Sequence, residues 1–86
     1  MKNKVVIITG ASSGIGKACA QEFGKQGARL MLAARNEEKL KSLNNILNQS
    51  GGQSHYIVTD VSIELDCKNM INKTIDIYGS IDILIN

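Results

Sequence analysis

The chain has 86 residues, of which 43% are hydrophobic and 21% are charged, so it can form one globular unit and no more. Its net charge of +2 is scattered, and no basic run with interleaved aromatic residues predicts nucleic-acid binding. No apolar segment is long enough to span a membrane, and the N-terminus lacks the pattern of a signal peptide, so we expect a cytoplasmic protein without membrane contact.

A continuous run of apolar, mostly β-branched residues from Lys4 to Thr9 predicts a strand that is buried on both faces. A glycine-rich turn follows it, and after this turn the apolar residues recur with helical spacing until Gly27, which is expected to end the helix. The apolar face expected for this helix consists of Ile15, Ala18, Cys19 and Phe23.

Strands and helices continue to alternate through the rest of the sequence. Asn36 is expected to cap the second helix, which ends at the pair Gly51 and Gly52, and Ser62 is expected to cap the third, which ends at Gly79. The residues expected on the buried faces are Leu40, Leu43 and Leu47 of the second helix and Cys67, Met70, Ile71, Thr74, Ile75 and Tyr78 of the third. The remaining strands are expected at Ala28 to Ala34, His55 to Thr59 and Ile81 to Ile85.

This β-α-β-α-β-α-β order predicts an α/β fold with a parallel sheet and right-handed crossovers. In a doubly wound sheet of the Rossmann type the expected strand order is 3-2-1-4, with the glycine-rich turn at the switch point between strands 1 and 4. Only half of the six-strand arrangement of that fold is accounted for, and the fourth strand would expose an unpaired apolar edge. We therefore expect residues 1–86 to be the N-terminal part of a longer domain, and a complete small protein is the less favoured alternative.

The turn from Gly10 to Gly16 is the main candidate for a binding site. Glycine permits a sharp turn and lets a ligand come close to the backbone. A turn between a buried strand and a helix N-terminus presents free N–H groups and the positive end of the helix dipole to a phosphate. Ser12 and Ser13 add hydroxyl donors to the amides of Gly14 and its neighbours. A purely structural turn is the weaker alternative, because a strand precedes this turn and a helix follows it.

The end of the second strand predicts which nucleotide is preferred. An acidic residue about 20 positions beyond the glycines would bind a ribose 2′-hydroxyl and select NAD. Ala34 stands 18 residues after Gly16 and is not acidic, and Arg35 follows it. A guanidinium there can make paired, charge-assisted bonds to a 2′-phosphate, which favours NADP. The alternative is a surface arginine that pairs with Glu37 or Glu38.

Asp60 and Val61 end the third strand at the edge of the sheet where ligands bind in this fold. Asp60 could accept a hydrogen bond from an adenine amino group or could cap the following helix, and the spacing does not decide between these two roles.

Five other residues with reactive side chains are expected to carry no chemistry. Cys19 and Cys67 lie far apart and outside any metal-binding spacing, so we expect two buried reduced thiols and no metal site. His55 has no partner of known role, and Lys73 and Tyr78 have the wrong order and spacing for a catalytic tyrosine and lysine pair. We expect Tyr78 to be a ring at the edge of the core and Lys73 to be a solvated charge.

Four segments together resemble the short-chain dehydrogenase/reductase family: Thr9 to Gly16, Ala34 to Asn36, Asp60 to Ser62 and Ile81 to Asn86. The resemblance implies that the loop from Gly10 to Gly16, which includes Ile15, wraps the pyrophosphate of the cofactor. It further implies that Ser12, Arg35 and Asn36 flank the 2′-phosphate, that Asp60 and Val61 lie against the adenine, and that Asn86 lies near a ribose.

The chemistry that the resemblance implies is reversible hydride transfer between NADP(H) and a carbonyl or alcohol substrate. The serine, tyrosine and lysine that catalyse it in the family have no counterpart in residues 1–86, so we expect an NAD(P)-binding Rossmann part that precedes the catalytic part and has no turnover of its own. The family also implies a small-molecule substrate and a homo-oligomer for the whole protein. One alternative is a non-catalytic NAD(P)-binding sensor on the same fold, and another is a fragment that binds no cofactor.

Overall fold

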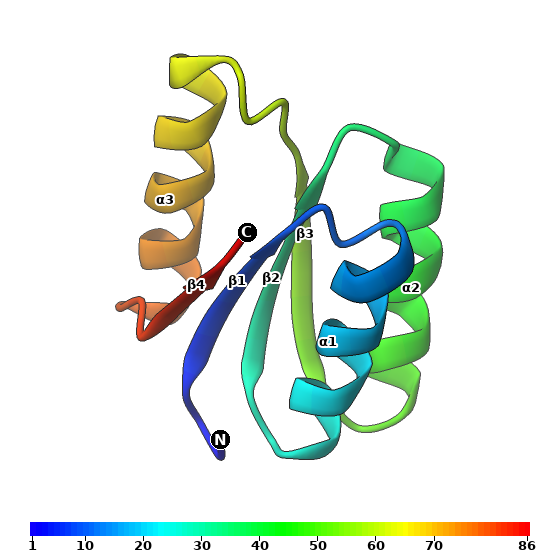
Figure 1. Cartoon of the computed structure of the whole chain (residues 1–86). Helices are drawn as coiled ribbons and strands as arrows, with labels where there is room; N and C mark the ends of the chain where they lie inside the picture. The colour runs from blue at the N-terminus through cyan, green and yellow to red at the C-terminus, as the bar shows by residue number, and fades with distance from the viewer.

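β1 (Val5–Thr9) lies inside a four-stranded parallel sheet whose order is β3-β2-β1-β4. The computed structural model describes residues 1–86, in which strands alternate with helices throughout (Figure 1). The predicted 3-2-1-4 order and the Rossmann-type α/β fold are therefore confirmed. The other elements are α1 (Gly14–Lys25), β2 (Arg29–Ala34), α2 (Glu37–Gln49), β3 (Gln53–Val58), α3 (Glu64–Tyr78) and β4 (Ile83–Ile85).

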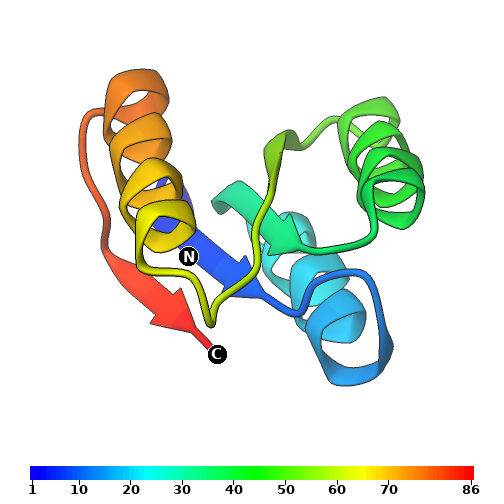
Figure 2. The same cartoon turned by 90° about the horizontal axis from the view of Figure 1, so that it is seen from above.

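Helices cover both faces of the sheet, which explains why β1 is apolar at every interior position. α1 and α2 lie on one face, and α3 lies on the other (Figure 1 and Figure 2). Val6 and Ile8 pack into the core on the side of α1 and α2, whereas Ile7 packs with Met70 of α3. All three of these β1 side chains are fully buried, and burying each stabilises the fold by about 1.5–3 kcal/mol.

α1 turns a different face to the sheet from the one that the sequence predicts. Of the four residues expected on its apolar face, Ile15 and Ala18 are exposed, and the fully buried residue of this helix is Ala20. Gly16 causes this difference, because it rests against the backbone of Gly10. Ala20 lies one helical turn after Gly16 on the same face and is therefore turned towards the sheet as well.

Three other residues are less buried than the sequence predicts. Cys19 and Cys67 are free thiols as expected, but each is partly exposed, so the expectation of buried thiols is wrong. Ile75 of α3 is exposed, because this helix covers its face of the sheet alone and buries only Met70 and Thr74. None of the three helices combines the length and the apolar character that crossing a membrane requires.

β4 is joined to β1 by contacts at both of its ends. Before the strand begins, the carboxylate of Asp82 accepts a hydrogen bond from the N–H of Val5 at 2.8 Å, and the N–H of Asp82 donates to the carbonyl of Val5 at 2.9 Å. After it ends, the hydroxyl of Thr9 donates to the carbonyl of Ile85 at 3.3 Å. These contacts align the carboxyl ends of β1 and β4, which places Asn86 beside Thr9.

β3 forms one edge of the sheet, and side chains occupy part of its free backbone. The amide of Asn48 in α2 accepts a hydrogen bond from the N–H of Ser54 at 2.9 Å and donates to its carbonyl at 3.0 Å. The ammonium of Lys73 in α3 donates to the carbonyl of Tyr56 at 3.1 Å, so Lys73 is not simply a solvated charge. These bonds occupy backbone groups that an exposed edge would offer to another strand.

Replacing Asn48 with alanine removes both hydrogen bonds to Ser54 and should lower the free energy of unfolding by about 1–2 kcal/mol. N45A is the matched control, because Asn45 is exposed on the same helix and makes no side-chain hydrogen bond. Urea denaturation measures both losses, and size-exclusion chromatography reports whether the freed edge of β3 promotes association. Equal unfolding free energies for the two variants would contradict the role given to Asn48.

Replacing Gly16 with alanine should destabilise the fold by about 3 kcal/mol, because the new Cβ would overlap the carbonyl oxygen of Gly10 and lie 2.8 Å from its carbonyl carbon. G24A is the control on the same helix, since its Cβ would meet only side-chain atoms, of Leu47 at 3.3 Å and of Leu30 at 3.7 Å, and alanine favours a helix. Thermal unfolding should separate the two variants clearly. A G16A protein as stable as G24A would disprove the close approach.

Candidate functional site

The loop between β1 and α1 contains two glycines whose backbone conformation requires this residue. Gly10 has φ of 63° and Gly14 has φ of 47°, both in the left-handed region that other residues rarely adopt. A Cβ at either position would meet nothing within 4 Å. The loop is therefore open on its outer side, and its shape is set by conformation at Gly10 and Gly14 and by close packing at Gly16.

The N-terminus of α1 is electrostatically prepared for an anion. Ser13 precedes the helix in an extended conformation, but its side chain makes no capping hydrogen bond, so the first N–H groups keep no side-chain acceptor. The first turn of α1 contains no acidic residue, whereas α2 and α3 each have two acidic residues in the first turn. Free N–H groups and an uncompensated helix dipole favour a bound phosphate or carboxylate.

A cleft of about 500 Å³ lies at the carboxyl ends of β1, β2 and β3, beside this loop. It brings together seven of the eleven residues that the sequence singles out, although they come from three separate segments of the chain. Those seven are Gly10, Ser12, Ser13, Arg35, Asn36, Asp60 and Val61. Gly14, Ile15, Gly16 and Asn86 do not line this cleft. The other three lining residues are Ala34, Thr59 and Ser62, which the sequence did not assign to cofactor binding.

Arg35 and Asn36 follow β2 at one side of the cleft. Arg35 is exposed and makes no ion pair, so the alternative pairing with Glu37 or Glu38 is not observed. Asn36 caps α2 as predicted, because its Oδ1 accepts a hydrogen bond from the N–H of Lys39 at 3.1 Å. The guanidinium of Arg35 is therefore free for a ligand, while the side chain of Asn36 is already engaged through its oxygen.

Asp60 forms a turn at the opposite side of the cleft. Its Oδ1 accepts hydrogen bonds from the hydroxyl of Ser62 at 2.6 Å and from the N–H of Ser62 at 2.9 Å. The bond from the hydroxyl, followed by the bond from the N–H, lowers the pKa of this carboxyl below its usual range. Ser62 therefore stabilises the turn at Asp60 and does not cap α3. The prediction that it caps this helix is wrong, since the N-cap residue is Ile63, which makes no side-chain capping bond.

Two further polar residues that line this cleft could have been found from their position in the sequence, shortly after a strand. Thr59 and Ser62 flank the pair Asp60 and Val61 at the end of β3, so a search of all polar residues after each strand would have found them. Thr59 is buried, and its hydroxyl donates to the carbonyl of Ile57 at 3.1 Å. It shapes the loop, whereas Asp60 is only partly buried.

Asn86 lies at the carboxyl end of β4, on the other side of β1 from the cleft. Its Oδ1 accepts a hydrogen bond from the hydroxyl of Thr9 at 3.3 Å. The strand order places Asn86 at the switch point, because β1 lies between β2 and β4. Asn86 is thus on the same edge of the sheet as the glycine loop, but outside the cleft that Arg35 and Asp60 line.

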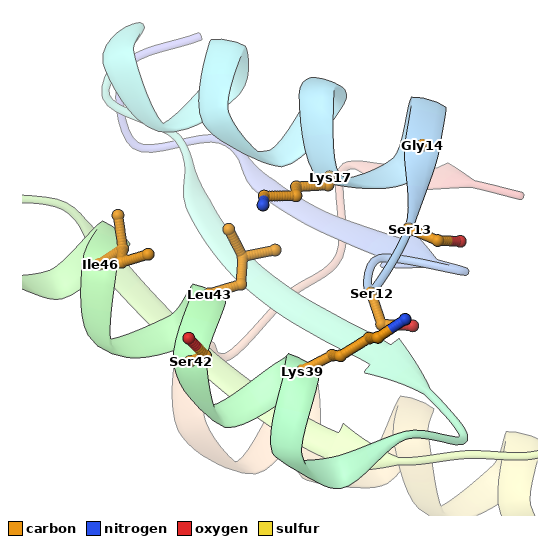
Figure 3. A pocket seen from close by; sticks show the side chains of 8 residues that line it. All are labelled: Ser12, Ser13, Gly14, Lys17, Lys39, Ser42, Leu43 and Ile46. Atoms are coloured by element: carbon orange, nitrogen blue, oxygen red, sulfur yellow. The ribbon is translucent and has the colours of Figure 1, made fainter.

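A second cleft, of about 420 Å³, lies between the first turn of α1 and the N-terminal three turns of α2 (Figure 3). It shares Ser12 and Ser13 with the first cleft and is otherwise lined by different residues. The remaining lining residues are Gly14, Lys17, Lys39, Ser42, Leu43 and Ile46. The sequence did not single out Lys17 or Lys39, because only the packing of α1 beside α2 brings them together.

Tyr78 and His55 lie away from both clefts and have structural surroundings. The hydroxyl of Tyr78 donates to the carbonyl of Leu30 at 2.9 Å, and its ring contacts His55 edge-on at 5.7 Å between ring centroids. Burial raises the pKa of Tyr78 to about 12. A tyrosine with this pKa is a poor general acid near neutral pH, and its half-buried ring, bonded to the backbone of Leu30, agrees with the prediction of a ring at the edge of the core.

Sequence comparisons with known proteins all point to the same family. A sequence profile described as short chain dehydrogenase matches residues 4–86. An 11-beta-hydroxysteroid dehydrogenase B of Sesamum indicum is 45% identical over 87 residues, an alignment that covers 100% of this chain and 24% of that protein. An uncharacterized oxidoreductase of Listeria monocytogenes is 45% identical over 82 residues, covering 95% of this chain and 33% of that protein.

Solved structures agree with the sequence matches. L-sorbose reductase of Gluconobacter frateurii, complexed with NADPH and L-sorbose, has a TM-score of 0.94 and 33% identity, covering 98% of this chain and 32% of that one. A short chain dehydrogenase/reductase of Burkholderia phymatum in complex with NAD has a TM-score of 0.95 and 30% identity, covering 96% of this chain and 30% of that one. The chain therefore spans about a quarter to a third of the length of these relatives.

Replacing Ser62 with alanine should raise the pKa of Asp60 towards its usual value of 3.8, because the substitution removes the hydroxyl donor and weakens the turn that this hydroxyl supports. A lowered native pKa stabilises the fold above pH 3.8, and this contribution is lost as the pH falls through the native value. Carboxyl chemical shifts followed by NMR during an acid titration measure the change. S80A is the control, since Ser80 is exposed and makes no side-chain hydrogen bond, and an unchanged Asp60 titration in S62A would refute the assignment.

Proposed function

The chain belongs to the short-chain dehydrogenase family, and on this basis we propose that it binds NADP(H) for an oxidoreductase that acts on a carbonyl or alcohol substrate. The observation that carries the proposal is the cleft beside the glycine loop. It combines an uncapped helix N-terminus, two serine hydroxyls and the unpaired guanidinium of Arg35. Such a set of donors matches a ligand with several phosphate groups.

The residues around the loop fit a dinucleotide on physical grounds. Gly10 and Gly14 leave open space where a side chain would stand, and the first turn of α1 offers N–H groups without a competing carboxylate. We assign the pyrophosphate to the segment from Gly10 to Gly16, with Ile15 and Gly16 presenting backbone N–H groups. Asn86, beside the end of β1, is assigned to the neighbourhood of a ribose.

The adenosine half is assigned to the cleft between Arg35 and Asp60. The carboxylate of Asp60 is partly exposed and can accept a hydrogen bond from an adenine amino group even while Ser62 occupies its other oxygen. Val61 is exposed beside it and supplies an apolar surface for the base. Ser12, Arg35 and Asn36 are assigned to the 2′-phosphate, with Asn36 using its amide nitrogen because its oxygen caps α2.

The preference for NADP over NAD is based on Arg35 and on the absence of an acidic residue at Ala34. An acidic residue at that position would repel a 2′-phosphate, whereas an unpaired guanidinium attracts it. The solved relatives do not decide this point, since one is complexed with NADPH and another with NAD. The preference is therefore a property that we propose for this chain from its own residues.

In the proposed reaction the nicotinamide of the bound cofactor supplies or accepts a hydride, and the residues of this chain bind and orient the dinucleotide. We propose no role as a proton donor or acceptor for any of the residues assigned here. A small-molecule carbonyl or alcohol substrate and a homo-oligomeric assembly are proposed for the whole protein. The sensor alternative gains no support from relatives that are named dehydrogenases and oxidoreductases.

Replacing Arg35 with alanine should weaken NADPH binding about tenfold or more and leave NADH binding nearly unchanged, because only NADPH presents the 2′-phosphate. Isothermal titration calorimetry with each dinucleotide measures both constants. K25A is the control for removal of a positive charge, since Lys25 lies in the last turn of α1, at the opposite end from the loop. Equal losses for NADPH and NADH in R35A would reject the assignment.

A further inference from the structure

The second cleft offers a cation that neither the sequence pattern nor the proposed function uses. Lys39 lies in the first turn of α2, and its backbone N–H donates a hydrogen bond to Oδ1 of Asn36 at 3.1 Å. Its side chain extends from α2 towards Ser12, and both residues line this cleft (Figure 3). Lys17, which lines the same cleft from α1, points away from Ser12 in this view. The two lysines therefore differ in what their ammonium groups can reach.

Ser12 is the residue that connects the two clefts. It lines the first cleft together with Arg35 and the second together with Lys39. Neither Arg35 nor Lys39 forms an ion pair, and the molecule's only ion pair joins Lys68 to Glu64 on α3. Two cations that form no ion pair thus line the two clefts that Ser12 connects, and the charge of Arg35 acts on Asp60 from beyond ion-pair distance.

The charge of the ligand explains why a second cation is useful there. A phosphate monoester carries about −1.5 to −2 charges at pH 7, since its second pKa is about 6. One guanidinium neutralises only part of this charge, and a lysine ammonium on the other side of the phosphate would neutralise the rest. A 2′-hydroxyl in the same place is uncharged and gains little from either cation.

We propose that Lys39 determines the specificity for NADP by binding the same 2′-phosphate as Arg35, with the hydroxyl of Ser12 between them. This proposal is based on the proposed function and adds a residue to it. Lys39 comes four positions after Arg35, and the capped first turn of α2 turns its side chain back towards the glycine loop. The ammonium contacts the ligand and takes no part in the hydride transfer.

Titration of the purified protein with NADPH and with NADH tests this role. K39A should weaken NADPH binding about tenfold, the loss expected for one charge-assisted hydrogen bond, and should leave NADH binding unchanged. K39R should keep most of the discrimination, because it retains the charge. K41A is the matched control, since Lys41 is exposed on the same helix and lines neither cleft. The effect of K39A should also shrink at high salt, where exposed charges are screened.

The outcomes separate this inference from the proposed function. Wild-type protein that binds neither dinucleotide would overturn both. Discrimination that falls in R35A and not in K39A would overturn the role of Lys39 and leave the proposed function intact. Equal weakening of NADPH and NADH in K39A would also overturn it, because a purely structural lysine affects both ligands alike. Circular dichroism of each variant shows that the comparison is made between folded proteins.

Discussion

The contact between Gly16 and Gly10 is the constraint on which the rest of this molecule depends. Because Gly16 has no side chain, the first turn of α1 can rest directly on the backbone at the end of β1. This contact directs the free N–H groups of α1 to the carboxyl edge of the sheet and sets which face of the helix is buried. Ala20 is turned inward and Ile15 outward as a consequence.

The helix N-termini on the face of the sheet that α1 and α2 share serve opposite purposes. The N-terminus of α2 needs no ligand, because Asn36 caps it and the carboxylates of Glu37 and Glu38 complement its dipole. α1 has neither a side-chain cap nor an acidic first turn. The unsatisfied end lies beside Arg35, an unpaired cation, so the electrostatic potential around the loop favours an anion.

Burial is uneven between the two faces of the sheet, and this explains why the predicted buried face of α3 was inaccurate. α1 and α2 share a core of eleven buried residues with the sheet, whereas α3 closes a core of four. On the shared face, apolar spacing identified Leu40, Leu43 and Leu47 correctly. A helix that packs alone against a sheet buries a narrower stripe, so Ile75 is exposed although its spacing is apolar.

The sequence by itself determined the order of the elements, the parallel sheet and the strand order, because buried parallel strands and glycine-ended helices leave strong local patterns. It also identified seven residues of the cleft, since ligands in such sheets bind where strands end. Tertiary structure alone decided that Ser62 holds Asp60 instead of capping α3, because two hydrogen-bonding roles compete for one side chain. It alone also showed that Lys39 and Ser12 line one cleft, because which residues distant in sequence share a cleft depends on how helices pack and not on local spacing.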